Sequence, residues 1–143
     1  MPVTTAKTLV DTGPLVAALN ANDEYHGWAR EVFGRLPPPA FTCEAVLSEA
    51  QFLLQDRGGD PLAVLEWVRQ GVFGLPFAAA DEIERLLELQ RSYRHLPMDF
   101  ADACLVRMAE LHERSQVLTT DSHFRIFRRN RRQVIPLLAP PGI

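Results

Sequence analysis

The chain has 143 residues, of which 47% are hydrophobic and 23% charged, and its formal net charge is −3. These values are typical of one folded domain with a sizeable core, and they exclude a disordered chain. They also argue against a strongly basic nucleic-acid binder, although the local distribution of charge matters more than its sum. We therefore expect a single domain over residues 1–143.

Two cysteines, Cys43 and Cys104, lie far apart and form no CxxC motif, which argues against a zinc site. We expect both to be packed, reduced thiols. The N-terminus shows no signal peptide, and no apolar stretch is long enough to cross a bilayer. These features favour a cytoplasmic protein that makes no use of a membrane.

Short apolar strands alternate with helical segments along the chain. The residue patterns predict strands at 7–10, 40–42, 72–77, 116–120 and 133–138. They predict helices at 15–19, 24–36, 44–54, from 60 onward, at 81–96, at 98–112 and just after residue 121. Strands separated by helices predict an α/β fold with a mainly parallel sheet that is covered on both faces.

Two strands are each followed by an aspartate with a threonine beside it. The strand at 7–10 leads into Asp11 and Thr12, and the strand at 116–120 ends at Thr120 before Asp121. In open α/β sheets, ligands bind just beyond the carboxyl ends of the strands. Each aspartate could instead be only a helix cap or a turn residue, so the position alone leaves both interpretations open.

Two further acids occur inside apolar helical segments. Glu49 has Leu47 and Ala50 as near neighbours, so its charge must reach solvent, a partner or a polar pocket. Asp102 follows Asp99 at a spacing of three residues, which places both on one helix face. Asp99 is explained as a helix cap, whereas Asp102 is less easily explained in that way.

Together these acids predict one shared pocket. Carboxylates that are brought together repel one another, so they either take up protons or recruit a cation. Oxygen ligands without histidine or cysteine favour Mg²⁺ or Mn²⁺ over zinc. Such ions assist the hydrolysis of phosphodiester bonds.

Four segments, in the same order along the chain, resemble the motifs of PIN-domain ribonucleases, in particular the VapC-type toxins of bacterial toxin–antitoxin pairs. The segments are residues 9–17, 42–54, 100–103 and 118–124. The resemblance implies a PIN-like three-layer sandwich and hydrolysis of RNA that depends on Mg²⁺ or Mn²⁺. It also implies a small antitoxin partner and a homodimer.

The resemblance further implies roles for individual residues. The metal-binding and catalytic acids would be Asp11, Glu49, Asp102 and Asp121. Thr12 and Thr120 would be supporting hydroxyls, and Asp99 occupies the place of an auxiliary acid that some relatives carry.

A run of arginines follows Asp121 and includes Arg125, Arg128 and Arg129. Its position beside the acids predicts contacts to substrate phosphates, and the alternative is a solvated helix and loop. Three other functions compete with a nuclease. A phosphoryl-accepting receiver needs a late lysine, and a haloacid-dehalogenase-like phosphatase needs an aspartate where Gly13 stands. The third is a non-catalytic α/β interaction module whose acids are only helix caps.

Overall fold

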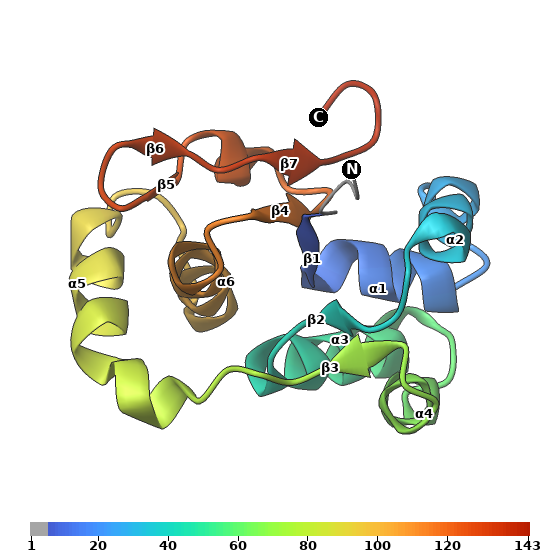
Figure 1. Ribbon diagram of the computed structural model, residues 1–143. Helices are drawn as coiled ribbons and strands as arrows, with labels where there is room; N and C mark the ends of the chain where they lie inside the picture. The colour runs from blue at the N-terminus through green and yellow to red at the C-terminus, as the bar shows by residue number, and fades with distance from the viewer. Residues whose placement is uncertain (1–5) are drawn as a thin grey trace, which may run out of the picture.

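The computed structural model describes residues 6–143 and has a parallel sheet with helices on both sides (Figure 1). The sheet order is β3-β2-β1-β4-β7, and every neighbouring pair is parallel. Its strands are β1 (Lys7–Val10), β2 (Ala40–Phe41), β3 (Phe73–Gly74), β4 (Ser115–Leu118) and β7 (Leu137–Leu138). The remaining strands, β5 (Arg128–Arg129) and β6 (Gln133–Val134), form an antiparallel hairpin.

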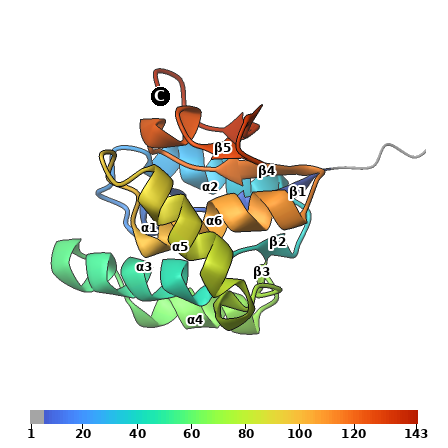
Figure 2. The same ribbon diagram turned by 90° about the vertical axis from the view of Figure 1, so that its left-hand side faces the viewer.

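The helices form the two outer layers. They are α1 (Thr12–Leu19), α2 (His26–Arg35), α3 (Glu44–Arg57), α4 (Leu62–Arg69), α5 (Ile83–Ser92) and α6 (Phe100–Leu111). Two short 3₁₀ helices, η1 (Ala79–Glu82) and η2 (Ser122–Arg125), complete the set. Figure 1 shows α1 and α2 on one side of β1, and α5 and α6 on the other, and Figure 2 shows α5 and α6 from their own side. The predicted α/β class with a mainly parallel sheet is therefore confirmed.

Two predicted elements differ from the structure, and one strand was not expected. The strand expected at 133–138 is two strands, because Pro136 has no N–H for a continuous ladder. The helix expected at 81–96 begins with η1 and ends at Ser92. Tyr93 leaves helical geometry there, and its hydroxyl accepts a hydrogen bond of 3.0 Å from the Arg128 amide. The strand β5 was not predicted.

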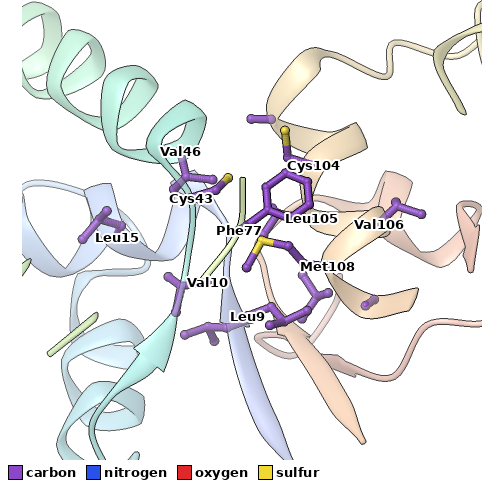
Figure 3. Packing of buried hydrophobic residues seen from close by; sticks show 14 of the residues in the cluster. Leu9, Val10, Leu15, Cys43, Val46, Phe77, Cys104, Leu105, Val106 and Met108 are labelled. Carbon is purple, nitrogen blue, oxygen red and sulfur yellow. The ribbon is translucent and has the colours of Figure 1, made fainter. Parts of the chain in front are cut away.

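The core lies between the sheet and the helices. Leu9 and Val10 of β1 are fully buried, as expected for a central strand that is covered on both faces. Figure 3 shows these residues with Val46 of α3 and with Leu105 and Met108 of α6, around Phe77. Cys43 and Cys104 are free and buried in this core, as the sequence predicted. Within residues 6–143, no helix is both long and apolar enough to span a bilayer.

A buried ion-pair network joins the β5–β6 hairpin to α5 and α6. The Glu110 side chain on α6 is only 2% exposed and accepts hydrogen bonds from Arg85 at 2.6 Å and Arg107 at 3.2 Å. The Asn130 amide in the hairpin turn also donates to Glu110, at 2.6 Å. One carboxylate therefore holds three elements that are distant in the sequence.

Candidate active site

The register between β1 and β4 brings the two strand tips together. Val10 pairs with Leu118, so the next residues, Asp11 and Thr119, are level with each other. The Thr119 hydroxyl donates to Asp11 Oδ2 at 2.7 Å, and its oxygen accepts from the Asp121 amide at 2.9 Å. Thr119 is fully buried and connects the two acids. Thr120, the residue predicted from the sequence as the supporting hydroxyl, does not make this link, because the β1–β4 register places Thr119 opposite Asp11.

The β1–α1 turn packs tightly against the end of β4. The Thr12 amide donates to Asp11 Oδ1 at 2.8 Å, so Asp11 caps α1. A Cβ added at Gly13 would lie 2.1 Å from the Thr120 hydroxyl oxygen, so any other residue there would force the Thr120 side chain to move. Thr120 therefore forms part of the wall around the acids rather than the link between them.

The first turn of α6 supplies two more acids. Asp99 accepts a hydrogen bond from the Asp102 amide at 2.8 Å, and Asp102 Oδ2 accepts one from the Asp99 amide at 3.2 Å. This reciprocal pair is a capping box, in which each side chain satisfies a free amide at the helix start. Asp102 therefore has a local structural role at the start of α6 that was not expected from the sequence.

Five carboxylates line one cleft of about 400 Å³ at the carboxyl edge of the sheet. Its lining residues are Asp11, Thr12, Gly13, Glu49, Leu53, Pro97, Asp99, Asp102, Thr120, Asp121 and His123. Among the described residues, no lysine or arginine belongs to this lining. The structure thus brings together all four predicted acids, the auxiliary Asp99 and both predicted threonines.

Three of the carboxyls in this cleft, those of Asp11, Glu49 and Asp102, have raised pKa values and so resist ionisation. Burial raises the pKa of Asp11 to about 7, against the hydrogen bonds from Thr119 and the Thr12 amide, while the charges of Asp121 and Glu49 raise it further. Burial, followed by the charges of Asp99 and Asp11, raises the pKa of Asp102 to about 8. Burial and the Asp99 charge also raise the pKa of Glu49. Positive charge in the cleft would relieve this repulsion.

The donor atoms suit a hard cation. Five carboxylates and two threonine hydroxyls supply oxygen, which is the ligand chemistry that Mg²⁺ prefers, and His123 adds a single imidazole at the lining. Thr12 Oγ1 is buried and has no well-formed hydrogen bond among residues 6–143. It nevertheless lies close enough to the Glu49 carboxyl to lower the pKa of that group. In the same residues, no group of three His, Cys, Asp or Glu side chains is arranged to hold a metal ion. The acids share a cleft rather than a finished coordination sphere.

We predict that Asp102→Asn stabilises the cation-free protein. An acid with a raised pKa in the folded state loses stability as pH rises from its ordinary pKa towards the raised one. Asparagine cannot ionise, and its carbonyl can still accept from the Asp99 amide. In EDTA at about pH 8 we expect a Tm gain of about 4 °C, which corresponds to about 1 kcal/mol. The gain should shrink towards about pH 5, because the folded wild type is protonated there. Calorimetry checks this, and an equal gain at both pH values would contradict it.

The arginine run lies outside the cleft lining. Arg128 Nη1 donates to the carbonyls of Arg125, Ile126 and Phe127, at 2.7 to 3.2 Å, and thereby closes the end of η2. Arg129 Nη1 donates to the Ala109 carbonyl at 3.4 Å, and Arg125 Nε donates to the Ile143 carbonyl at 2.7 Å. These contacts give the run a structural role and lend no support to its predicted phosphate contacts.

His123, which lies just before the arginine run, does line the cleft. Its Nδ1 lies 2.8 Å from Asp121 Oδ1, and its amide donates to the same oxygen at 2.9 Å. Asp121 therefore caps η2 while its carboxylate is partly exposed to the cleft.

Fold and cleft together define an α/β protein with an anionic site at the carboxyl edge of a parallel sheet. The chain belongs to the PIN-domain family, whose model matches residues 8–130. Nucleases of this family generally use divalent metals. No curated protein sequence matches the chain at a significant level.

Two solved structures are similar to this chain. VapC20 of Mycobacterium tuberculosis, described as a toxin that cleaves the sarcin–ricin loop, is 26% identical with a TM-score of 0.72. The match covers 81% of this chain and 91% of VapC20. A toxin–antitoxin complex from Klebsiella pneumoniae matches at 19% identity and a TM-score of 0.56, over 81% of this chain and 88% of that one. The second likeness shows the fold alone.

Proposed function

We propose that this protein is an endoribonuclease that depends on Mg²⁺ or Mn²⁺ and acts as the toxin of a toxin–antitoxin pair. The observation that carries the proposal is the convergence of five carboxylates on one cleft whose described lining lacks lysine and arginine. RNA is a polyanion, so its phosphates approach such a cleft only when cations neutralise it. The family match and the likeness to VapC20 favour RNA as the substrate.

The four acids Asp11, Glu49, Asp102 and Asp121 would hold the cation, with Asp99 as an auxiliary acid. A bound Mg²⁺ or Mn²⁺ would supply positive charge against the phosphodiester and would help to generate the attacking nucleophile from water. Thr119 keeps Asp11 and Asp121 at a fixed separation, while Thr12 and Thr120 support the cleft wall. The buried positions of Asp11 and Asp102, each 6% exposed, keep these two carboxylates in place.

The competing function is an interaction module without catalysis. It is favoured by the hydrogen bonds of Asp11, Asp102 and Asp121, each of which helps to cap a helix. A carboxylate at a helix start is normally stabilised there by the backbone amides, which lowers its pKa. Asp11 and Asp102 instead have raised pKa values, and Glu49 caps no helix. Capping alone therefore does not explain the set of acids.

The direct test is cleavage of RNA by the purified protein. We expect cleavage of RNA in Mg²⁺ or Mn²⁺ and its loss in EDTA, because the acids repel the phosphates without a cation. An oligonucleotide that carries the sarcin–ricin loop is the first substrate to try, because VapC20 is described as cleaving it. A preparation that cleaves equally well in EDTA, or leaves every RNA intact, would contradict the proposal.

An antitoxin partner is part of the same proposal, and a complex of this kind is among the similar structures. A small protein that binds the chain and suppresses cleavage would support it. The homodimer stays a prediction, which light scattering of the purified protein tests.

A further inference from the structure

A second hollow, of about 310 Å³, adjoins the acid cleft. The two spaces share Gly13, Leu53 and Thr120, so these residues form the neck between them. Beyond the neck the hollow is lined by Val16, Asp23, Glu24, Tyr25 and Arg57. A chain-like ligand that is cleaved in the acid cleft could therefore continue through the neck into this hollow.

One face of α3 runs along both spaces. Glu49, Leu53 and Arg57 are four residues apart, so they lie on one side of the helix with a rise of about 6 Å at each step. Glu49 lines the cleft, Leu53 lines both spaces, and Arg57 lines the hollow. The helix thus carries an acid to the proposed reaction centre and a base about 12 Å further along its axis.

Arg57 is positioned by the turn that ends α3. Gly58 and Gly59 have φ values of +116° and +105°, which favour glycine. A Cβ at Gly59 would lie 3.0 Å from the Leu19 carbonyl oxygen, so the turn packs against the end of α1. Arg57 is exposed, and among the described residues its guanidinium has no ion pair or hydrogen bond. By contrast, Arg69 at the end of α4 is paired with Glu66.

Tyr25 supplies an aromatic ring to the same hollow. Its amide donates to Asp23 Oδ1 at 2.9 Å, and its ring packs edge-on against Trp28 with a centroid separation of 6.4 Å. The residue is half-buried and lines the hollow. Aromatic rings that are held in this way are the usual platforms on which single-stranded bases stack.

We propose that this hollow is a nucleotide subsite of the RNA-binding surface, in which Arg57 contacts a backbone phosphate and Tyr25 stacks on the adjoining base. The inference rests on the proposed nuclease function and deepens it. Asp23 and Glu24 repel phosphate, so the phosphate belongs at the Arg57 end of the hollow and the base at the Tyr25 end. A basic side chain of a protein partner would suit those two acids, but Arg57 would repel it.

The test measures RNA binding without turnover, in an Asp11→Asn background, by the fluorescence anisotropy of a labelled single-stranded RNA octamer in Mg²⁺. Added to this background, Arg57→Gln should weaken binding about 10-fold and lower the slope of log Kd against log salt by about 1. Tyr25→Leu should weaken binding about 5- to 100-fold, whereas Tyr25→Phe should retain it. Arg69→Gln is the matched control, since Arg69 also ends a helix but lines neither space.

Two outcomes separate this subsite from the proposed function. If the octamer neither binds the Asp11→Asn protein nor is cleaved by the wild type, the nuclease assignment fails and the subsite fails with it. If RNA is bound and cleaved, yet Arg57→Gln and Tyr25→Leu behave like Arg69→Gln, the subsite alone is wrong. Thermal unfolding of each variant shows whether a loss of binding reflects a loss of folded protein.

Discussion

Asp11→Asn should lower the rate of RNA cleavage more than about 100-fold while the protein stays folded. Mutating a residue that only hydrogen-bonds to a metal ligand already costs about 10- to 100-fold in activity, and Asp11 is proposed to be a ligand itself. Asp11 is buried at the strand tip and lies at the centre of the repulsion among the acids. Asparagine keeps a similar shape and can still accept from the Thr12 amide, but it removes the negative charge. Initial cleavage rates in Mg²⁺ and Mn²⁺ measure the effect.

Asp56→Asn is the matched control, because Asp56 is an exposed acid on α3 that does not line the cleft. We expect its cleavage rate to equal that of the wild type. If Asp11→Asn cleaves at the rate of this control, the acids are not the reaction centre. The acids would then be helix caps, as in an interaction module without catalysis.

Glu110→Gln should destabilise the fold by about 3 kcal/mol, the lower end of the cost of removing one partner from a buried ion pair, because each arginine keeps a second glutamate partner. Glu110 accepts from both Arg85 and Arg107, and Arg85 is itself only 16% exposed. A glutamine amide would present N–H groups to these guanidinium groups, which would keep only their ion pairs with Glu88 and Glu82. Urea denaturation of the wild type and the variant measures the difference in the free energy of unfolding.

The same carboxylate predicts a pH dependence. Burial by itself would raise the pKa of Glu110, but hydrogen bonds from Arg85 and from the Asn130 amide outweigh it and hold the pKa below its ordinary value. The stability that Glu110 contributes is therefore present above about pH 4.3 and is lost as pH falls through the lowered pKa. The difference in the free energy of unfolding between the wild type and Glu110→Gln should therefore become smaller at acidic pH.

Glu66→Gln provides the control for Glu110→Gln. Glu66 forms an ion pair with Arg69, but the two side chains are 46% and 76% exposed. Such surface pairs contribute about 0–1 kcal/mol. Equal losses for the two variants would show that burial does not strengthen the Glu110 network.

Local sequence patterns predicted the parallel sheet and the two acids that follow its strands. Leu9-Val10-Asp11 contains an apolar strand and its polar end within a few residues, and Leu118 to Asp121 repeats the arrangement. Parallel pairing then brings both ends to the same edge, a rule that requires no knowledge of the rest of the chain. The convergence of these two acids with Glu49 and Asp102 follows from the same rule and from the helices that connect the strands.

Other features depend on contacts that a sequence pattern does not contain. Thr119 rather than Thr120 joins the strand ends because of the β1–β4 register, which the sequence alone leaves open. Arg128 looks like a phosphate ligand in the sequence, but the fold turns its guanidinium onto backbone carbonyls. Arg57 was not singled out, because only the packing of α3 beside α1 places it next to the cleft.

We propose that the acids that follow β1 and β4, together with those on α3 and α6, act as one cation site. Calorimetric titration of Mn²⁺ into the wild type and into Asp11→Asn at neutral pH tests it most directly. We expect saturable binding by the wild type and affinity at least about 10-fold weaker in the variant. Equal affinity in the two proteins, or no binding by the wild type, would contradict the account.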